Sequence, residues 1–248
     1  MNNMVKDSFS EIFSSKKKVM FVYAHPDDAE MYSGGLIARL VKEGIEVLHV
    51  KTTKGNKGSR QDKYTESDLA NIRETEDEAG LEILGLAPKN SVNLNLGDGQ
   101  IENNLDNIEK IVKQIRTFKP DLIVTHNPEK VVIKDDFGEF YLNHRDHRNT
   151  AISAVDAAYP YSRDNLFFPK QIEEGLSPHI VKEFLFADFW GDPDLVYFDI
   201  TNFFDQKINA IASHKSQYSE EKAKGAADYF APEKEGRRYE QFRYIKAD

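Results

Sequence analysis

The chain has 248 residues and a formal net charge of −9 at pH 7, because 42 Asp and Glu outnumber 33 Lys and Arg. An acidic chain is poorly suited to neutralising phosphates, which argues against general nucleic-acid binding and against attachment to anionic membrane surfaces. The sequence contains no cysteine. Disulfides and thiolate metal sites are therefore excluded, and a transition-metal site would need His and carboxylate ligands.

The chain opens with a strand–helix–strand pattern. Residues 18–24 (KVMFVYA) form a continuous apolar run that is typical of a buried parallel strand. A polar loop follows, and residues 33–44 then place apolar side chains at helical spacing and end at a glycine. Residues 45–53 (IEVLHVKTT) are the next predicted strand. Such a unit implies parallel pairing and a right-handed crossover.

The alternation of helices and strands continues along the chain, and it becomes looser after residue 158. We predict helices over 66–85, 103–118, 147–158 and 203–218, and strands over 91–96, 122–126, 181–188 and 195–200. This pattern predicts an α/β fold, a Rossmann-like three-layer sandwich with a mostly parallel sheet and a less regular C-terminal third. We see no linker or repeat, and we expect a single domain over residues 1–248.

No segment of the sequence looks like a membrane span. The apolar run Val19–Tyr23 is far too short for a signal peptide or a transmembrane helix, and no later run reaches the required length. We therefore expect a soluble, cytoplasmic protein.

The first cluster of polar side chains directly follows the first predicted strand. It consists of His25, Pro26, Asp27 and Asp28. Two adjacent carboxylates repel each other unless a cation relieves them, which favours a metal site. The alternative is a polar turn in which an aspartate caps the next helix.

The second cluster, Asn143-His144-Arg145-Asp146-His147-Arg148, precedes another predicted helix. Its two His are three residues apart and project to similar sides of a helical turn. The alternative is a solvated helix start with a capping residue.

The two clusters together indicate more than either does alone. Both follow strands whose carboxyl ends should meet at the same edge of the sheet, where open α/β sheets build their sites. A catalytic zinc site typically has three protein ligands and one open position. His25, Asp28 and either His144 or His147 would supply the three, which leaves a second carboxylate and a second His for acid–base work.

These motifs, in this order, resemble the PIG-L/LmbE-like family of zinc-dependent de-N-acetylases. The resemblance covers nearly the whole chain. It includes AHPDD (24–28), GG (34–35), TTKGNKGS (52–59), IRETEDEAGLEILG (72–85), LGDG (96–99), HRDHR (144–148), VYFDIT (196–201), HKSQY (214–218) and RRYEQFR (237–243).

The resemblance implies a zinc site and a general base in the two clusters. His25, Asp28 and His147 would bind Zn²⁺, and Asp27 would take a proton from the attacking water. The implied reaction is removal of the N-acetyl group from an N-acetylglucosamine-type sugar or sugar conjugate, a small-molecule substrate, with release of acetate. The resemblance also allows a homo-oligomer.

Four further residues receive roles from the resemblance. His144, as an imidazolium, would help to stabilise the oxyanion, and either His144 or Asp27 would protonate the leaving amine. Asp146 would orient and charge-balance His144. Arg73 and Asp98 match positions that contact the substrate in family members; the alternatives are a surface ion pair on a helix for Arg73 and a turn residue for Asp98.

The sequence also departs from the family pattern. Ala29 stands where many members have a glutamate, and the acid follows as Glu30. Residues 131–142 lengthen the segment before the second cluster, which we expect to reshape the rim of the pocket. The spacing around Tyr239 and Glu240 is unusual.

Other functions remain alternatives at this point. They are deacylation of a non-sugar N-acyl compound on the same scaffold, a binding protein without activity, and a metal-dependent phosphoesterase. The last would need more bridging carboxylates than the two clusters supply.

Overall fold

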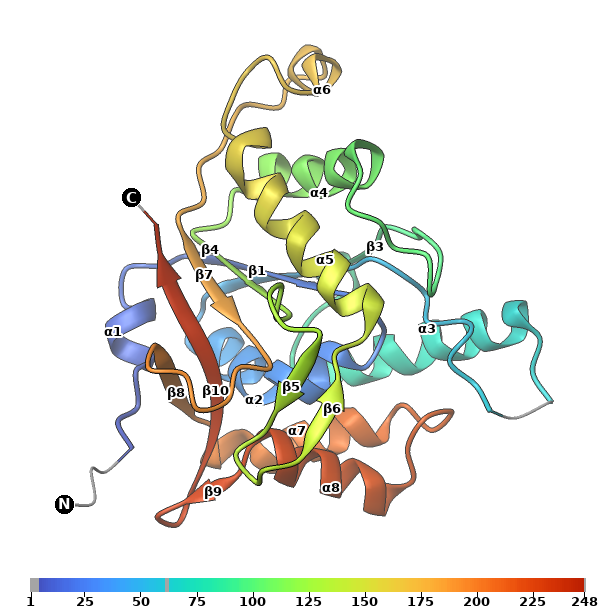
Figure 1. Ribbon diagram of the computed structural model, residues 1–248, viewed down its shortest axis with the longest axis vertical. Coiled ribbons are helices and arrows are strands. Elements are labelled where there is room, and N and C mark those ends of the chain that lie inside the picture. The colour runs from blue at the N-terminus through green and yellow to red at the C-terminus, as the bar shows by residue number, and fades with distance from the viewer. Residues whose placement is uncertain (1–4, 61–62, 248) are drawn as a thin grey trace.

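The computed structural model describes residues 5–60 and 63–247. Within these ranges an eight-stranded sheet forms the centre, with helices on both faces (Figure 1). The strands along its path run in the order β3-β2-β1-β4-β7-β10-β8, and β9 pairs with β10. This confirms the predicted α/β class with a mostly parallel sheet.

The bounds of the elements are as follows. The strands of the main sheet are β1 (Lys18–Tyr23), β2 (Glu46–Lys51), β3 (Ser91–Asn93), β4 (Leu122–Thr125), β7 (Glu183–Phe186), β8 (Leu195–Asp199), β9 (Glu233–Lys234) and β10 (Arg237–Lys246); β5 (Val132–Lys134) and β6 (Phe140–Leu142) form a separate hairpin. The α-helices are α1 (Phe9–Phe13), α2 (Asp28–Lys42), α3 (Glu66–Ile83), α4 (Leu105–Phe118), α5 (Arg145–Asp156), α6 (Pro169–Glu173), α7 (Phe204–Ala212) and α8 (Glu220–Phe230).

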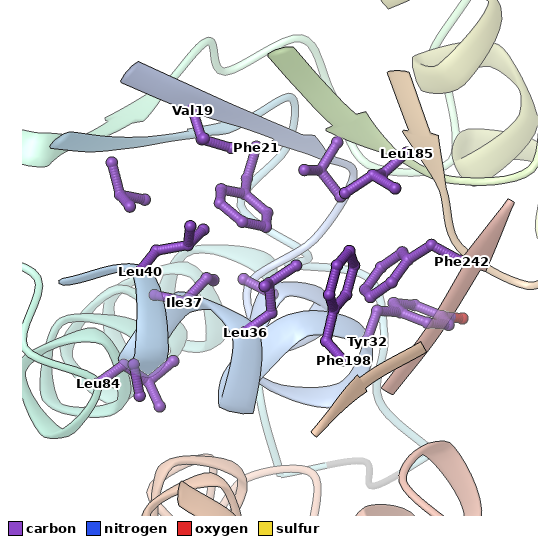
Figure 2. Packing of buried hydrophobic residues seen from close by; sticks show 14 of the residues in the cluster. Val19, Phe21, Tyr32, Leu36, Ile37, Leu40, Leu84, Leu185, Phe198 and Phe242 are labelled. Carbon is purple, nitrogen blue, oxygen red and sulfur yellow. The ribbon is translucent and has the colours of Figure 1, made fainter. Parts of the chain in front are cut away.

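The two faces of β1 explain the three layers. Val19 and Phe21 point to the α2 side of the sheet, where Figure 2 shows them beside Leu36 and Ile37. The alternate residues Met20 and Val22 belong to a second core with α4 and α5. A strand buried on both faces reads as the continuous apolar run seen in the sequence.

The order of the parallel strands places a switch point between β1 and β4. After β1 the chain continues to β2 and β3 on one side of β1, and it then returns to β4 and β7 on the other side. All of these strands pair in parallel. Open α/β sheets bind ligands at such a point, beyond the carboxyl ends of the strands. Both polar clusters reach this edge.

The end of the sheet that carries β10 is antiparallel. β10 pairs antiparallel with β7 and with β8, so the C-terminal third departs from the regular alternation, as predicted. Buried Glu240 on β10 accepts hydrogen bonds from the backbone N–H groups of Gly35 and Leu36 at 2.9 and 2.8 Å, and its Oε1 lies 2.6 Å from the Lys207 Nζ. Gly35 has to be glycine because a Cβ there would lie 2.6 Å from Ile200.

Some predicted elements differ from the observed ones. The helix predicted over 203–218 ends at Ala212, since Ser213 and Ser216 engage side chains and carbonyls outside the helix instead of continuing it. The helix predicted over 33–44 begins earlier, at Asp28. The hairpin β5–β6 and helix α8 were not predicted.

None of the helices described combines the length and the apolar composition that crossing a membrane requires.

Candidate metal centre and active site

The two polar clusters come together in one cavity of about 330 Å³ at the switch point. β1 delivers the first cluster to this edge, and the first turn of α5 delivers the second. The cavity is lined by His25, Asp27, Asp28, Met31, Lys57, Gly58, Arg73, Asp98, Gly99, His144, His147 and Gln217. It therefore holds seven of the eight residues to which the resemblance assigns a role, and the eighth, Asp146, lies 3.4 Å from the His25 ring at its edge.

His25, Asp28 and His147 form a tight triangle of side chains, in which two ring nitrogens and both Asp28 oxygens are potential ligand atoms. The His25 Nδ1 lies 3.2 Å from the His147 Nε2 and 3.3 Å from an Asp28 oxygen, and the other Asp28 oxygen lies 3.3 Å from the His147 Nε2. Ligands bound tetrahedrally to zinc at about 2.0–2.1 Å are separated by about 3.3 Å. The spacing of the three side chains thus fits a single metal ion.

His126 lies beside this triangle and offers another ligand combination with Asp28 and His147. Its ring stacks on that of His147, with centroids 3.9 Å apart. However, the His126 Nε2 accepts the backbone N–H of Ala24 at 3.1 Å, and burial together with the neighbouring His147 lowers its pKa to about 3. We therefore interpret His126 as a neutral packing partner that orients the His147 ring.

The second ring nitrogen of His25 faces two carboxylates. Its Nε2 lies 3.3 Å from Asp98 and 3.4 Å from Asp146. Asp146 also accepts the backbone N–H groups of Gly99 and Ile101 at 2.6 and 3.3 Å. Burial alone would raise the pKa of Asp146, but the hydrogen bonds from His25 and Gly99 keep it below its usual value.

The position of Asp146 differs from the expectation that it orients His144. Its carboxylate is directed at His25, and its link to His144 runs through its backbone N–H, which donates to the His144 Nδ1 at 3.2 Å. Carboxylates behind a metal-binding imidazole fix its orientation and tautomer. Asp146 and Asp98 are placed for that task on His25.

His144 caps the N-terminus of α5. Because its Nδ1 accepts a backbone N–H, a neutral ring must carry its proton on Nε2. Burial lowers the pKa of His144, and the rings of His25 and His147 lower it further. The geometry thus favours a neutral ring with an Nε2–H donor, in place of the imidazolium implied by the family resemblance.

Asp27 adopts a left-handed backbone conformation, with φ at 98°. Non-glycine residues in this region are uncommon and cluster at functional sites. One carboxylate oxygen lies 3.0 Å from the Arg73 guanidinium, and the other accepts a hydrogen bond from the Tyr218 hydroxyl at 3.1 Å. Burial raises the pKa of Asp27, Arg73 opposes this rise, and Asp28 adds to it.

Arg73 is not part of a surface ion pair. Its side chain is buried, donates to the carbonyl oxygens of Gly55 and Pro26, and lies at the cavity against Asp27. Asp98 accepts the backbone N–H of Lys57 at 2.6 Å and likewise lines the cavity. Substrate contacts by both residues remain predictions.

Tyr218 is the residue near Asp27 that sequence reasoning missed. It was assigned to a helix, so no direction towards the first cluster was expected. The signal available was the HKSQY segment, whose polar residues after an apolar helix favour a turn.

His214 of the same segment is fully buried and lies 3.3 Å from Glu30, the glutamate that follows Ala29 in the first cluster.

The segment 131–142 forms the hairpin β5–β6 immediately before His144. Val132, Phe140 and Leu142 are exposed, although Val132 and Leu142 pair across the hairpin. Tyr141 points inward and donates to Asp188 at 2.9 Å. The hairpin thus presents apolar side chains close in sequence to the second polar cluster.

Comparison with known proteins identifies a family and several relatives. The family model described as PIG-L, GlcNAc-PI de-N-acetylase, matches residues 20–159, which is more than half of the chain. Diacetylchitobiose deacetylase from Thermococcus kodakarensis is 27% identical over 212 residues, covering 86% of this chain and 74% of the relative. A probable N-acetyl-alpha-D-glucosaminyl L-malate deacetylase from Bacillus cereus is 27% identical over 210 residues, covering 82% and 84%.

A solved structure agrees with these matches. The N,N'-diacetylchitobiose deacetylase from Pyrococcus horikoshii, complexed with an inhibitor, superimposes with a TM-score of 0.81 at 26% sequence identity. The superposition covers 94% of this chain and 85% of that one.

Proposed function

Because the chain belongs to the PIG-L family of de-N-acetylases, we propose that it hydrolyses the N-acetyl amide of a glucosamine-type sugar or sugar conjugate. The products would be acetate and a free amine. The observation that carries this proposal is the triangle of His25, Asp28 and His147 in one cavity with Asp27. Relatives named as deacetylases of diacetylchitobiose and of a GlcNAc–malate conjugate support the substrate class.

We propose that the metal is zinc and that His25, Asp28 and His147 hold it. The triangular spacing supports this ligand set, and a chain without cysteine has to use such ligands. When bound, the metal would polarise the acetyl carbonyl and lower the pKa of a water molecule.

Asp27 would manage the protons of the reaction. Its carboxylate lies in the same cavity and is buried, and its raised pKa brings it closer to the working pH than that of an exposed aspartate. It would first accept the proton of the attacking water. The same carboxyl group would then deliver this proton to the leaving amine, so that the protein ends in its starting state.

His144 would contact the reacting amide, and two buried residues would hold the sugar. The Nε2–H of a neutral His144 would donate to the oxygen on which negative charge develops, a contact that is stronger in the transition state than in the bound substrate. Arg73 and Asp98 line the same cavity and would contact sugar hydroxyls. Asp146 would act through His25.

Acetate release by purified protein of known metal content tests the proposal. The panel would contain N-acetylglucosamine, its phosphates, its glycosides and diacetylchitobiose. We expect release that a chelator abolishes and that zinc restores. Zinc-loaded protein that releases no acetate from any of these compounds would refute the sugar assignment.

A deacylase of a non-sugar N-acyl compound is the second candidate. The exposed apolar side chains of the hairpin β5–β6 favour it, because they precede His144 directly and would suit a substrate with an apolar group. A series of N-acyl compounds of increasing chain length would separate the two, since only the second candidate predicts faster turnover of longer chains. A cytoplasmic location and assembly into a homo-oligomer remain predictions.

A further inference from the structure

The turn between α7 and α8, residues 213–219, reaches the proposed active site from the C-terminal third of the chain. Its Tyr218 hydroxyl donates to an Asp27 oxygen at 3.1 Å and also lies 3.2 Å from the Met31 sulfur. A carboxylate is a far stronger acceptor than a thioether, so the proton is directed to Asp27. Nothing in the sequence-based assignment of roles involves this residue.

The hydroxyl completes a pair of donors around Asp27. Arg73 lies 3.0 Å from one carboxylate oxygen, and Tyr218 donates to the other. With both oxygens occupied, the carboxylate cannot rotate about its terminal bond without breaking a charge-assisted hydrogen bond. Each oxygen keeps a second lone pair, and Asp27 lines the cavity.

The same helix supports both donors. Arg73 and Glu76 are three residues apart on α3, so they lie on one side of it. The Glu76 carboxylate accepts the backbone N–H and the hydroxyl of Ser216 at 2.7 and 2.6 Å. Because Ser216 precedes Tyr218 by two residues, α3 holds Arg73 directly and holds the turn that carries Tyr218 through Glu76.

We propose that Tyr218 is a positioning residue that fixes the orientation of the Asp27 carboxylate, and that Glu76 holds Tyr218 in place. This inference rests on the proposed function, in which Asp27 is the general base. A carboxylate that samples several orientations would meet the attacking water in the right geometry for only part of the time. The effect of Tyr218 should therefore be on turnover, with little effect on substrate or metal binding.

The first test is Tyr218→Phe, which removes the hydroxyl and keeps the ring. We expect kcat to fall about tenfold, which is the size of effect that one hydrogen bond to a charged group supports, while KM, zinc content and the melting temperature stay near those of the wild type. Tyr244→Phe is the matched control, since it also removes a tyrosine hydroxyl that donates to a carboxylate, that of Glu183, far from the cavity. It should keep the wild-type kcat.

The second test separates Glu76 from a general structural role. Glu76→Gln should lower kcat less than Tyr218→Phe does, and the double variant should be no slower than Tyr218→Phe alone, because both changes act on one hydroxyl. A double variant whose losses multiply would overturn the link between Glu76 and Tyr218.

The outcomes distinguish this inference from the proposed function. A wild type that deacetylates and a Tyr218→Phe variant of equal kcat would overturn the inference and leave the function standing. A wild type without activity would overturn the function; the crystal structure of Tyr218→Phe would then decide the inference. It predicts an Asp27 carboxylate in more than one orientation, and an unmoved carboxylate would contradict it.

Discussion

Replacing Asp146 with asparagine tests which histidine this residue serves. The family resemblance assigns Asp146 to His144, whereas its carboxylate lies 3.4 Å from the His25 Nε2. Asparagine has nearly the same shape but offers one acceptor oxygen in place of two. It therefore cannot satisfy Gly99, Ile101 and His25 together, as the carboxylate does.

The expected effect is a loss of metal affinity. Partners behind a metal ligand typically contribute a factor of about 10–100 in metal binding, or roughly 1.4–2.7 kcal/mol. We expect Asp146→Asn to lie at the lower end, about tenfold, because Asp98 remains 3.3 Å from the same nitrogen of His25. The double variant with Asp98→Asn should approach the upper end.

Zinc affinity is best measured by competition with a chromophoric chelator, and kcat is measured separately at saturating zinc. Asp156→Asn is the matched control: this aspartate lies on the same helix, and its carboxylate accepts from Asn103 at 2.7 Å. The control should bind zinc like the wild type. An Asp146→Asn variant with unchanged zinc affinity and a large loss of kcat would refute our reasoning. It would indicate that Asp146 orients His144, as the family resemblance implies.

Three further predictions concern catalysis and stability. Asp27→Asn should lower kcat by at least about 100-fold, because the general base is lost, while metal analysis should show zinc still bound. Glu240→Gln removes the counter-charge 2.6 Å from the fully buried Lys207 ammonium. It should lower the free energy of unfolding in urea by roughly 3–5 kcal/mol. The control Glu11→Gln breaks the exposed ion pair with Lys6 and should leave the free energy of unfolding unchanged. Burial raises the pKa of Asp188 to about 6, so its stabilising protonation is complete below about pH 4 and lost as the pH rises through 6. Between pH 4 and 7 the free energy of unfolding of the metal-free wild type should thus fall by roughly 3 kcal/mol more than that of Asp188→Asn. Parallel plots of unfolding free energy against pH for the two proteins would contradict this.

The parallel half of the fold could be predicted because its central strand, β1, is apolar after its first residue. Val19 to Tyr23 are buried on both faces of the sheet, which leaves a signal that needs no knowledge of the partners. The same reasoning placed both polar clusters at one edge, and the structure brings them into one cavity. The choice of His147 over His144 as the third ligand came from the family resemblance and not from the spacing.

The remainder could not be predicted, because tertiary contacts decide it. Helix α8 is mostly charged or small in sequence, and only Ala223 and Ala227 are buried on it. The hairpin β5–β6 exposes apolar side chains, whereas strand prediction assumes that apolar side chains are buried. The direction of Asp146 towards His25 depends on two backbone N–H groups of a distant loop, and no local pattern reveals that contact.

The contacts made by Tyr218 and Glu240 imply that the smallest active fragment extends well beyond the residues that match the family model. The family match ends at residue 159, and all proposed metal ligands and the proposed base precede that point. A fragment that stopped there would lose the Tyr218 hydroxyl that donates to Asp27 and the Glu240 carboxylate that accepts from Gly35 and Leu36 in the middle of α2. It would also expose the edge of β4 that β7 covers. Such a fragment would carry every proposed metal ligand and the proposed base, yet it would lack the contacts that orient Asp27 and cover the sheet, so a transplant of this centre into another scaffold would have to supply them.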